Sequence, residues 1–304
     1  MMYPFLMKPY IRDIVWGGTR LRDVYAKTLS VKAAESWEVS ANRDGESSIA
    51  NGELAGETLS SVIAKFPNEV LGKADAYFPY LFKLIDANDD LSIQVHPNDE
   101  YAQRVEHEPV GKTEVWYIID AEPGAKIGFG LCEPLNRTIV EKAVIEGNLE
   151  KYINYINVQP GGVFFIPAGL VHCLCGGLLV AELQQNSNLT YRLYDYNRVT
   201  NGQKRELHIE KGLDVCDFNK SIYVPPTENN GVLCECEYFT LKKINIKNRY
   251  TVDIDTFNII FFLSGGGVIR YAGGEADFKY GDTFLLPHDL TQCEITGECE
   301  MLLC

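Results

Sequence analysis

Short alternations of hydrophobic and polar residues dominate this chain, and Gly, Pro and Asn residues separate them. They predict strands at residues 36–40, 80–85, 91–95, 114–119, 163–166, 178–183 and 191–194, and again at 239–243, 259–263, 267–271 and 283–286. Many short strands punctuated in this way are typical of β-barrels and sandwiches, and not of a parallel α/β sheet.

A helical periodicity is confined to a few segments. It occurs at residues 58–66, around 100–105, at 207–215, and across 137–156, where Gly147 is expected to divide two helices. The predicted fold class is therefore mainly β, with a few helices.

The length of 304 residues exceeds what one core usually needs, so two domains are expected. The best candidate linker is Val-Pro-Pro-Thr-Glu-Asn-Asn-Gly at residues 224–231. We therefore expect a larger domain with helical segments at residues 1–223 and a strand-rich domain at residues 232–304.

One turn is more specific than the others. Residues 161–172, GGVFFIPAGLVH, fit G-x5-P-x-G-x2-H without a gap. Glycine permits a positive φ and proline fixes φ near about −65°, so the backbone bends sharply and presents His172 at the start of the next strand. The pattern resembles the second conserved motif of the cupin superfamily, which implies that His172 is a metal ligand.

The C-terminal segment repeats half of this motif. Residues 280–287, YGDTFLLP, contain the G-x5-P part, but no histidine follows at the ligand spacing, because His288 comes directly after the proline. We therefore expect two cupin-like β-barrels of the jelly-roll type, of which the second is degenerate and metal-free.

Two further strands carry polar faces that suit a metal site. In a strand, alternate residues share a face, which groups Ser92, Gln94 and His96 in one segment and Lys112, Glu114 and Trp116 in another. Together with His172, the residues His96 and Glu114 form a two-imidazole, one-carboxylate set that suits Zn²⁺ or non-haem Fe²⁺. Gln94 could add a neutral oxygen ligand.

The charge and the cysteine content indicate which binding partners and which cellular compartment to expect. The net charge of −14 disfavours nucleic acid and anionic membranes, so a phosphorylated substrate would need a local group of Lys or Arg. We find no apolar stretch of membrane-spanning length and no secretory signal pattern. The nine cysteines include no CxxC pair, which favours buried thiols in a reducing, cytoplasmic protein.

Four segments read together are similar to type I mannose-6-phosphate isomerase (phosphomannose isomerase) in its short bacterial form. They are ESWEVS at 35–40, QVHPNDEYA at 94–102, GKTEVWY at 111–117, and the run from 167 to 196 that contains PAGLVH, ELQQNS and YRLYDY. The sequence VWGG at 15–18 also fits. The resemblance is strong over roughly residues 1–215 and weaker beyond them.

The resemblance implies a zinc-dependent aldose–ketose isomerase that interconverts mannose 6-phosphate and fructose 6-phosphate through a cis-enediol. It implies one Zn²⁺ per chain, held by Gln94, His96, Glu114 and His172, and it makes Arg192 the catalytic arginine. The substrate would be a phosphorylated hexose, and the protein a monomer or homodimer without nucleic-acid or membrane partners.

The sequence leaves several roles open. Lys112 could be a catalytic proton shuttle, since a neighbouring cation would lower its pKa, or a plain cation that binds phosphate or hydroxyl groups. Glu182 could face the same cavity as a base or hydrogen-bond within the barrel. Without the resemblance, a structural role would be preferred for Arg192, either an ion pair with Asp195 or a cation–π contact.

Two other functions use the same pattern. A His/His/Glu set also serves Fe²⁺ in metal-dependent cupin oxygenases. A sugar-binding or regulatory cupin could keep its metal for structure alone, although Lys112 and Arg192 beside the ligands favour an enzyme.

Overall fold

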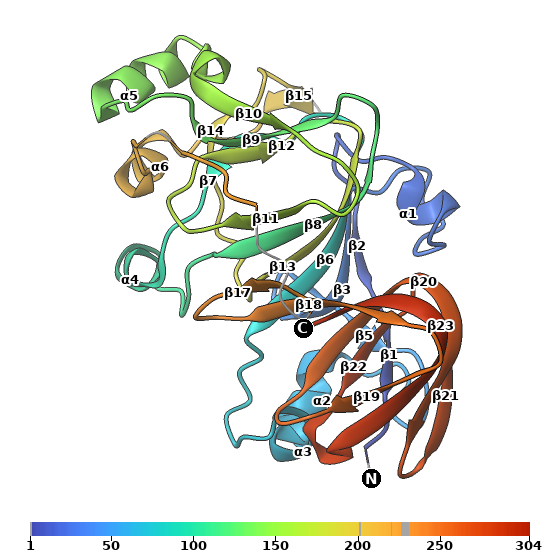
Figure 1. Cartoon of the computed structure of the whole chain (residues 1–304). Coiled ribbons are helices and arrows are strands. Elements are labelled where there is room, and N and C mark those ends of the chain that lie inside the picture. The colour runs from blue at the N-terminus through green and yellow to red at the C-terminus, as the bar shows by residue number, and fades with distance from the viewer. Residues whose placement is uncertain (1, 201, 220, 226–230) are drawn as a thin grey trace. The chain divides into compact units, whose positions relative to one another are not determined.

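We describe residues 2–200, 202–219, 221–225 and 231–304 in a computed structural model of the chain. The fold is mainly β with few helices, as predicted (Figure 1). Two compact units divide it. A central unit comprises Arg12–Glu35 and Leu84–Pro225, and a C-terminal unit comprises Met1–Ile11, Ser36–Lys83 and Pro226–Cys304. Each is described by itself.

The central unit contains two antiparallel sheets. One has the order β10-β9-β12-β7-β14, and the other runs β11-β8-β13 and continues into β6. The strands are β7 (Ile93–Val95), β8 (Glu114–Ala121), β9 (Lys126–Leu131), β10 (Ile153–Asn157), β11 (Val163–Ile166), β12 (His172–Leu174), β13 (Leu178–Gln185) and β14 (Tyr191–Tyr194), with a small hairpin of β15 (Val199–Thr200) and β16 (Gln203–Lys204). β6 (Tyr80–Ala87), β3 (Glu35–Asn42) and β2 (Tyr10–Arg12) each cross the boundary between the units.

Strand register places polar side chains on one face of the five-stranded sheet. Gln94 in β7 lies opposite both His172 in β12 and Arg192 in β14. Directly opposed residues in an antiparallel ladder project from the same face. Ile93 and Val95 therefore point the other way, into an apolar cluster with Val140 and Leu213.

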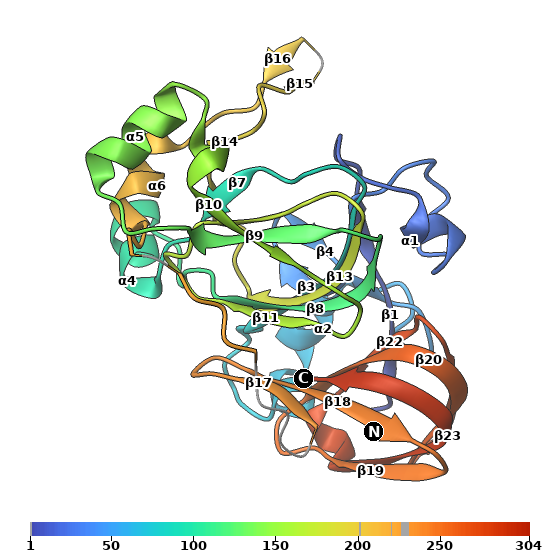
Figure 2. The same ribbon diagram turned by 45° about the horizontal axis from the view of Figure 1, so that its top comes forward.

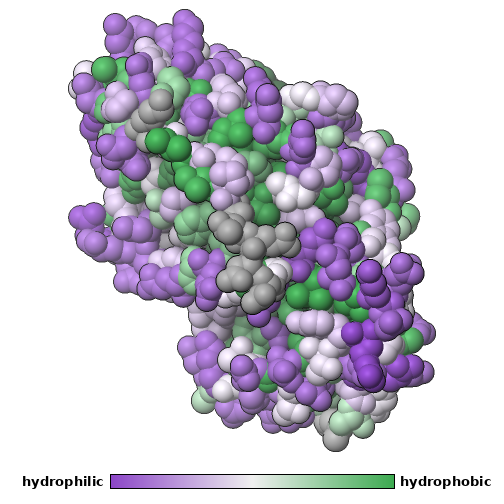
Figure 3. Space-filling view, in the orientation of Figure 1, coloured by the Kyte–Doolittle hydropathy of each residue, from purple (hydrophilic) through white to green (hydrophobic). Residues whose placement is uncertain are grey.

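Most helices of the central unit pack into that apolar cluster. They are α4 (Asp99–Tyr101), the π-helical turn Ala102–Glu106, α5 (Arg137–Ile145), the 3-10 turn Leu149–Tyr152 and α6 (Ile209–Val215). The short helix α1 (Arg20–Asp23) lies elsewhere in the unit, where Arg20 bonds to Asp86 of β6 and Leu178 of β13. Figures 1 and 2 show α5 and α6 beside the five-stranded sheet. Figure 3 shows hydrophilic residues predominating over the helical end of this unit. Each helix therefore buries one apolar face and leaves the other hydrated.

The C-terminal unit is built on one large antiparallel sheet of order β17-β18-β23-β20-β22-β1-β5. Its elements are β1 (Phe5–Lys8), β4 (Gly45–Glu46), β5 (Ser48–Ile49), α2 (Leu59–Lys65), α3 (Pro67–Leu71), β17 (Val232–Glu235), β18 (Thr240–Ile246), β19 (Arg249–Asp253), β20 (Asn258–Tyr271), β21 (Gly274–Lys279), β22 (Thr283–Leu286), the 3-10 turn His288–Leu290 and β23 (Gln292–Leu303). β20 and β23 approach so closely at Gly267 that a Cβ there would lie 2.0 Å from the Thr296 carbonyl oxygen.

The segment ESWEVS places a carboxylate inside the C-terminal unit. Glu38 in β3 is fully buried and accepts hydrogen bonds from the hydroxyls of Ser36, at 2.6 Å, and Thr283, at 2.5 Å. These bonds tie β3 to β22, and they satisfy a buried group that would otherwise be costly.

Several predicted elements are confirmed to the residue, among them the strands at 163–166, 191–194 and 283–286. The second helix expected within residues 137–156 is wrong. A 3-10 turn, Leu149–Tyr152, leads instead into β10, where Ile153, Tyr155 and Ile156 pair with β9. The β-branched and aromatic residues here pair in a strand, although their spacing also fits a helix.

The compact units divide the chain differently from the expected domains at residues 1–223 and 232–304. Residues 1–11 and 36–83 join the C-terminal segment, because β1 pairs with β22 and with β5. Of the expected linker, residues 226–230 lie outside the described residues. Among the described residues, no helix is long and apolar enough to cross a membrane.

Candidate metal centre

Three strands of the central unit bring three ligand-type side chains together at or next to their ends. Glu114 begins β8, His172 begins β12, and His96 follows directly after β7. A glycine permits the close approach of two of these segments, because a Cβ on Gly111 would lie 2.3 Å from the Pro97 carbonyl oxygen. In the turn that leads to His172, Gly169 adopts a φ of +88° and donates its N–H to the His96 carbonyl oxygen at 2.9 Å.

The three side chains converge in the interior. His172 Nε2 lies 3.4 Å from Glu114 Oε1, and His96 Nε2 lies 3.7 Å from Glu114 Oε2. The imidazole centroids are 4.7 Å apart, and the ligand atoms all lie within 4.8 Å of one another. All three side chains are buried. The structure therefore brings together the His/Glu/His set that the sequence predicted.

Backbone carbonyls fix the tautomer of each imidazole. His96 Nδ1 donates to the Leu189 carbonyl oxygen at 2.9 Å, and His172 Nδ1 donates to that of Leu170 at 2.8 Å. Since a carbonyl oxygen only accepts, each Nδ1 carries the proton and each Nε2 keeps its lone pair. Both lone pairs point toward the Glu114 carboxylate and are placed to bind a cation between them. A backbone carbonyl that holds the other ring N–H is the usual arrangement of a metal-binding histidine.

Electrostatics keeps these groups in their metal-binding protonation states. Burial, followed by the positive charge of Lys112, lowers the pKa of His96 to about 3, and burial also lowers the pKa of His172. Burial alone would raise the pKa of Glu114, but Lys112 together with His96 and His172 outweighs burial and holds that pKa well below its usual value. Neutral imidazoles and an ionised carboxylate are the forms that bind a cation.

A divalent cation fits this group. Glu114 Oε1 is buried without a hydrogen-bond partner among the residues that the structure describes, while Oε2 has Lys112 Nζ as its ion-pair partner at 2.7 Å. A buried carboxylate oxygen is rarely left without a partner unless a cation completes it. Two imidazole nitrogens and a carboxylate are ligands that zinc and iron both accept.

Gln94 lies beside the group but is less buried than the other three. Its Nε2 is 3.4 Å from His172 Nε2, and its Oε1 is 3.4 Å from the Ser92 hydroxyl. A 180° rotation of the amide would exchange its oxygen and nitrogen and turn the oxygen toward His172. Gln94 is therefore placed where a fourth oxygen ligand would be needed.

Lys112 lies against the same carboxylate. Its Nζ is 2.7 Å from Glu114 Oε2, 3.3 Å from His96 Nε2 and 3.9 Å from Glu182 Oε1. Burial lowers the pKa of Lys112, but Glu114 and Glu182 more than offset this, so the net shift is upward. The surrounding side chains therefore act against the lowered pKa that the sequence suggested.

Glu182 both faces this group and forms a hydrogen bond within the central unit. Its Oε2 accepts a hydrogen bond from Trp116 Nε1 at 2.9 Å, while Oε1 points toward Lys112. Glu182 is 3% exposed, so this carboxylate is shielded from bulk water. The hydrogen bond to Trp116 matches the structural alternative left open by the sequence, and the position beside Lys112 matches the expectation that Glu182 faces this group.

Arg192 lies on the face of Gln94, but its partners differ from the expected ion pair. Its Nη1 donates to the Glu206 carbonyl oxygen at 3.2 Å, whereas Asp195 forms ion pairs with Arg198 and with Arg205, the latter at 3.4 Å. Burial, followed by the positive charge of Arg192, lowers the pKa of Arg205. Among the described residues, Arg192 Nε and Arg205 Nη1 are buried without a hydrogen-bond partner.

Sequence reasoning missed this arginine cluster, which we define as Arg192, Arg198 and Arg205 around Asp195. Arg192 was expected, but Arg198 and Arg205 follow a turn in which Tyr196 and Asn197 both have positive φ, at 55° and 53°. The strand alternation ends at Tyr194, so periodicity carries no signal for residues beyond it.

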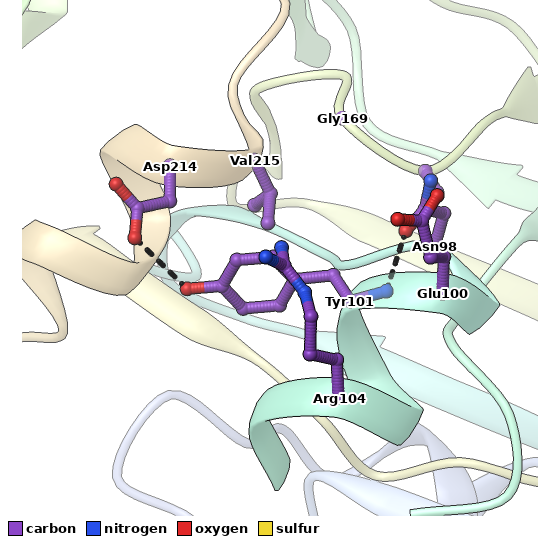
Figure 4. A pocket seen from close by; sticks show the side chains of 8 residues that line it. Asn98, Glu100, Tyr101, Arg104, Gly169, Asp214 and Val215 are labelled. Atoms are coloured by element: carbon purple, nitrogen blue, oxygen red, sulfur yellow. Dashed lines mark hydrogen bonds between the residues drawn. The ribbon is translucent and has the colours of Figure 1, made fainter.

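A separate hollow lies on the helical side of the unit (Figure 4). It has a volume of about 260 Å³. Figure 4 shows Tyr101 donating its hydroxyl to Asp214, with Arg104 beside the ring. Its lining includes no member of the His/Glu/His group.

The chain matches two family models. Residues 5–120 match the catalytic domain of type I phosphomannose isomerase, and residues 229–304 match the cupin domain of mannose-6-phosphate isomerase.

Relatives and a solved structure match over nearly the whole length. A Bacillus subtilis protein named probable mannose-6-phosphate isomerase GmuF is 38% identical over 100% of this chain and 99% of its own length. The B. subtilis mannose-6-phosphate isomerase ManA is 36% identical over 99% of this chain and 98% of its own. The crystal structure of a B. subtilis mannose 6-phosphate isomerase superposes with a TM-score of 0.91 at 34% identity, covering 99% of each chain.

Proposed function

This chain belongs to the type I phosphomannose isomerase family, a family of aldose–ketose isomerases, and we propose that it interconverts mannose 6-phosphate and fructose 6-phosphate with one bound Zn²⁺ through a cis-enediol intermediate. The metal-dependent chemistry is supported by one observation, which is that the buried side chains of His96, Glu114 and His172 converge beside Lys112.

We assign the ion to His96, Glu114 and His172, with Gln94 as a fourth ligand. Zinc suits this set because it accepts nitrogen and oxygen ligands in a small coordination shell. When bound, the ion supplies Lewis-acid stabilisation of negative charge on substrate oxygen, without redox chemistry. The carbonyls of Leu189 and Leu170 hold the imidazoles in place before the ion arrives, so little reorganisation is needed.

Proton transfer between C1 and C2 of the sugar needs an acid and a base in a shielded site. Lys112, whose Nζ lies 2.7 Å from Glu114 Oε2 and 3.9 Å from Glu182 Oε1, is placed to donate through Nζ to the substrate oxygen that gains charge. Glu182 is the neighbouring carboxylate outside the metal-binding group, so it is the candidate proton acceptor. Trp116 Nε1 fixes one of its oxygens and leaves the other directed at Lys112.

The arginine cluster supplies what the phosphate of the substrate requires. A protein of net charge −14 repels a phosphate at long range, so attraction has to come from local cations. Arg198 and Arg205 gather beside Arg192, and guanidinium groups fork onto phosphate oxygens. Arg192 itself lies opposite Gln94, at the metal-binding end, so we assign it to the charge that develops on the enediolate.

We propose that residues 232–304 form a degenerate, metal-free cupin barrel within the C-terminal unit. The family's cupin-domain model matches 229–304, and the G-x5-P turn leads from β22 into the 3-10 turn at His288–Leu290. Among the described residues, the only group of three or more His, Cys, Asp or Glu side chains placed to hold an ion is His96, Glu114 and His172.

The metal assignment predicts the result of removing each ligand. His96→Ala, Glu114→Ala and His172→Ala should each lose bound zinc and nearly all turnover, because a three- or four-ligand site rarely tolerates the loss of one ligand. Gln94→Ala should be milder, since water can replace a neutral amide. Metal analysis and a coupled assay for fructose 6-phosphate measure both effects. Full zinc content in any purified alanine variant would remove that residue from the set.

The role of Arg192 predicts a separation of kinetic constants. Lysine keeps the charge but loses the planar fork, so Arg192→Lys should retain zinc and lose on the order of a hundredfold or more in kcat, comparable to the loss of one oxyanion donor. Steady-state kinetics on metal-replete protein measures this. An unchanged kcat with a raised KM would instead place Arg192 in ground-state phosphate binding.

The degenerate barrel predicts that His288 is not a ligand. His288→Ala should leave zinc content and turnover almost unchanged, because this histidine packs against Gly72 of the same unit. Loss of one metal equivalent in this variant would show a second metal site and overturn the metal-free assignment.

A further inference from the structure

One buried amide joins the backbone segments that carry the metal-centre side chains. Gln185 ends β13 and is 4% exposed. Its Oε1 accepts the backbone N–H of Thr113 at 2.9 Å, and its Nε2 donates to Asp99 Oδ1 at 2.9 Å. Its own backbone N–H donates to the Thr113 carbonyl oxygen at 3.2 Å. Both ends of the amide are therefore committed, and each to a different segment.

These bonds hold Lys112 from both sides. Asp99 Oδ1 also accepts the N–H of Gly111 at 2.7 Å, and the N–H of Lys112 donates to the Pro97 carbonyl oxygen at 2.9 Å. Three successive N–H groups, at positions 111, 112 and 113, thus have fixed acceptors. Gln185 supplies one of these acceptors and orients Asp99, which supplies another. The backbone on which Lys112 and Glu114 stand is set by this closed ring of hydrogen bonds.

The same residue begins the turn that orients His96. The Gln185 carbonyl oxygen accepts the N–H of Ser187 at 2.7 Å. The Ser187 hydroxyl accepts the N–H of Leu189 at 3.3 Å, and the Leu189 carbonyl oxygen accepts the His96 Nδ1 proton. A displacement of Gln185 would therefore reach the imidazole through the carbonyl that selects its tautomer.

Only an amide can satisfy both partners of this side chain. Thr113 offers a donor and needs an acceptor, while Asp99 offers a carboxylate and needs a donor. Glutamate would keep the acceptor but face Asp99 with a second negative charge. Methionine would keep the length and lose both bonds, which would leave a buried N–H unsatisfied.

We propose that Gln185 is a positioning residue for the isomerisation, acting through Lys112 and His96 and not by touching substrate. This rests on the proposed function for its kinetic part, whereas its effect on the metal site is independent of turnover. Partners of ligands outside the coordination shell typically change metal affinity by about 10- to 100-fold when removed.

The test compares Gln185→Met and Gln185→Glu with a matched control. Ser47→Ala removes a buried hydroxyl that accepts the Ser40 N–H at 2.9 Å in the C-terminal unit, so it loses a buried hydrogen bond of similar kind away from the metal-centre segments. Each protein is measured for Zn²⁺ affinity by chelator competition, for the visible spectrum of the Co²⁺-loaded form, for kcat and KM, and for Tm.

Both Gln185 variants should bind Zn²⁺ at least about tenfold more weakly and show an altered Co²⁺ spectrum. At saturating zinc, kcat should fall about tenfold or more while KM changes little, because Lys112 is misplaced in the transition state. Ser47→Ala should lower Tm and leave the spectrum, the affinity and kcat unchanged. A lowered Tm with the original spectrum and kcat in Gln185→Met or Gln185→Glu would make Gln185 merely structural. If the unaltered protein lacked isomerase activity, the proposed function would fail, while the affinity and spectra would still decide the role of Gln185.

Discussion

The contact between a buried carboxylate and a buried ammonium is the interaction on which the rest of the central unit depends. Glu114 is fully buried and ionised, and Lys112 is 5% exposed, 2.7 Å away. Taking two charges out of water costs several kcal/mol per ion unless geometry and further bonds compensate. The surrounding architecture provides that compensation, because glycines admit the backbones, carbonyls orient the imidazoles and Gln185 fixes the loop. A divalent cation bound to Glu114 would further offset the free-energy cost of burying its negative charge.

This constraint also explains why strands and loops of the central unit contribute different residues to the site. The strands contribute rigid ladders that align Gln94, His172 and Arg192 on one face. The loops contribute the polar contacts that a ladder cannot make, at Pro97, Gly111 and Leu189. Apolar packing against α5 and α6 holds the opposite face of the same sheet. The strands therefore carry Glu114, His172 and Gln94, while His96 stands directly after β7 in a hydrogen-bonded loop.

Much of the site could be predicted from the sequence because its signals are local. Alternation placed Gln94 and His96 in one segment and Lys112 and Glu114 in another, and the Pro-Ala-Gly turn placed His172, so the convergence of the set followed. The arginines at 198 and 205 could not be predicted, because a positive-φ turn separates them from the strand. The role of Gln185 could not be predicted either, because its hydrogen-bond partners Asp99 and Thr113 are distant from it in the sequence. Residues 153–156 were expected to be helical because spacing alone does not reveal pairing with β9.

The most direct test of the account is the conversion of mannose 6-phosphate to fructose 6-phosphate, assayed before chelation, after chelation, and after the return of zinc. Activity should disappear as metal is removed and return with about one equivalent of Zn²⁺ per chain, since one buried His/Glu/His group is present among the described residues. Magnesium, which prefers oxygen ligands and octahedral geometry, should not restore it. Full turnover in protein shown by elemental analysis to lack metal would contradict the account.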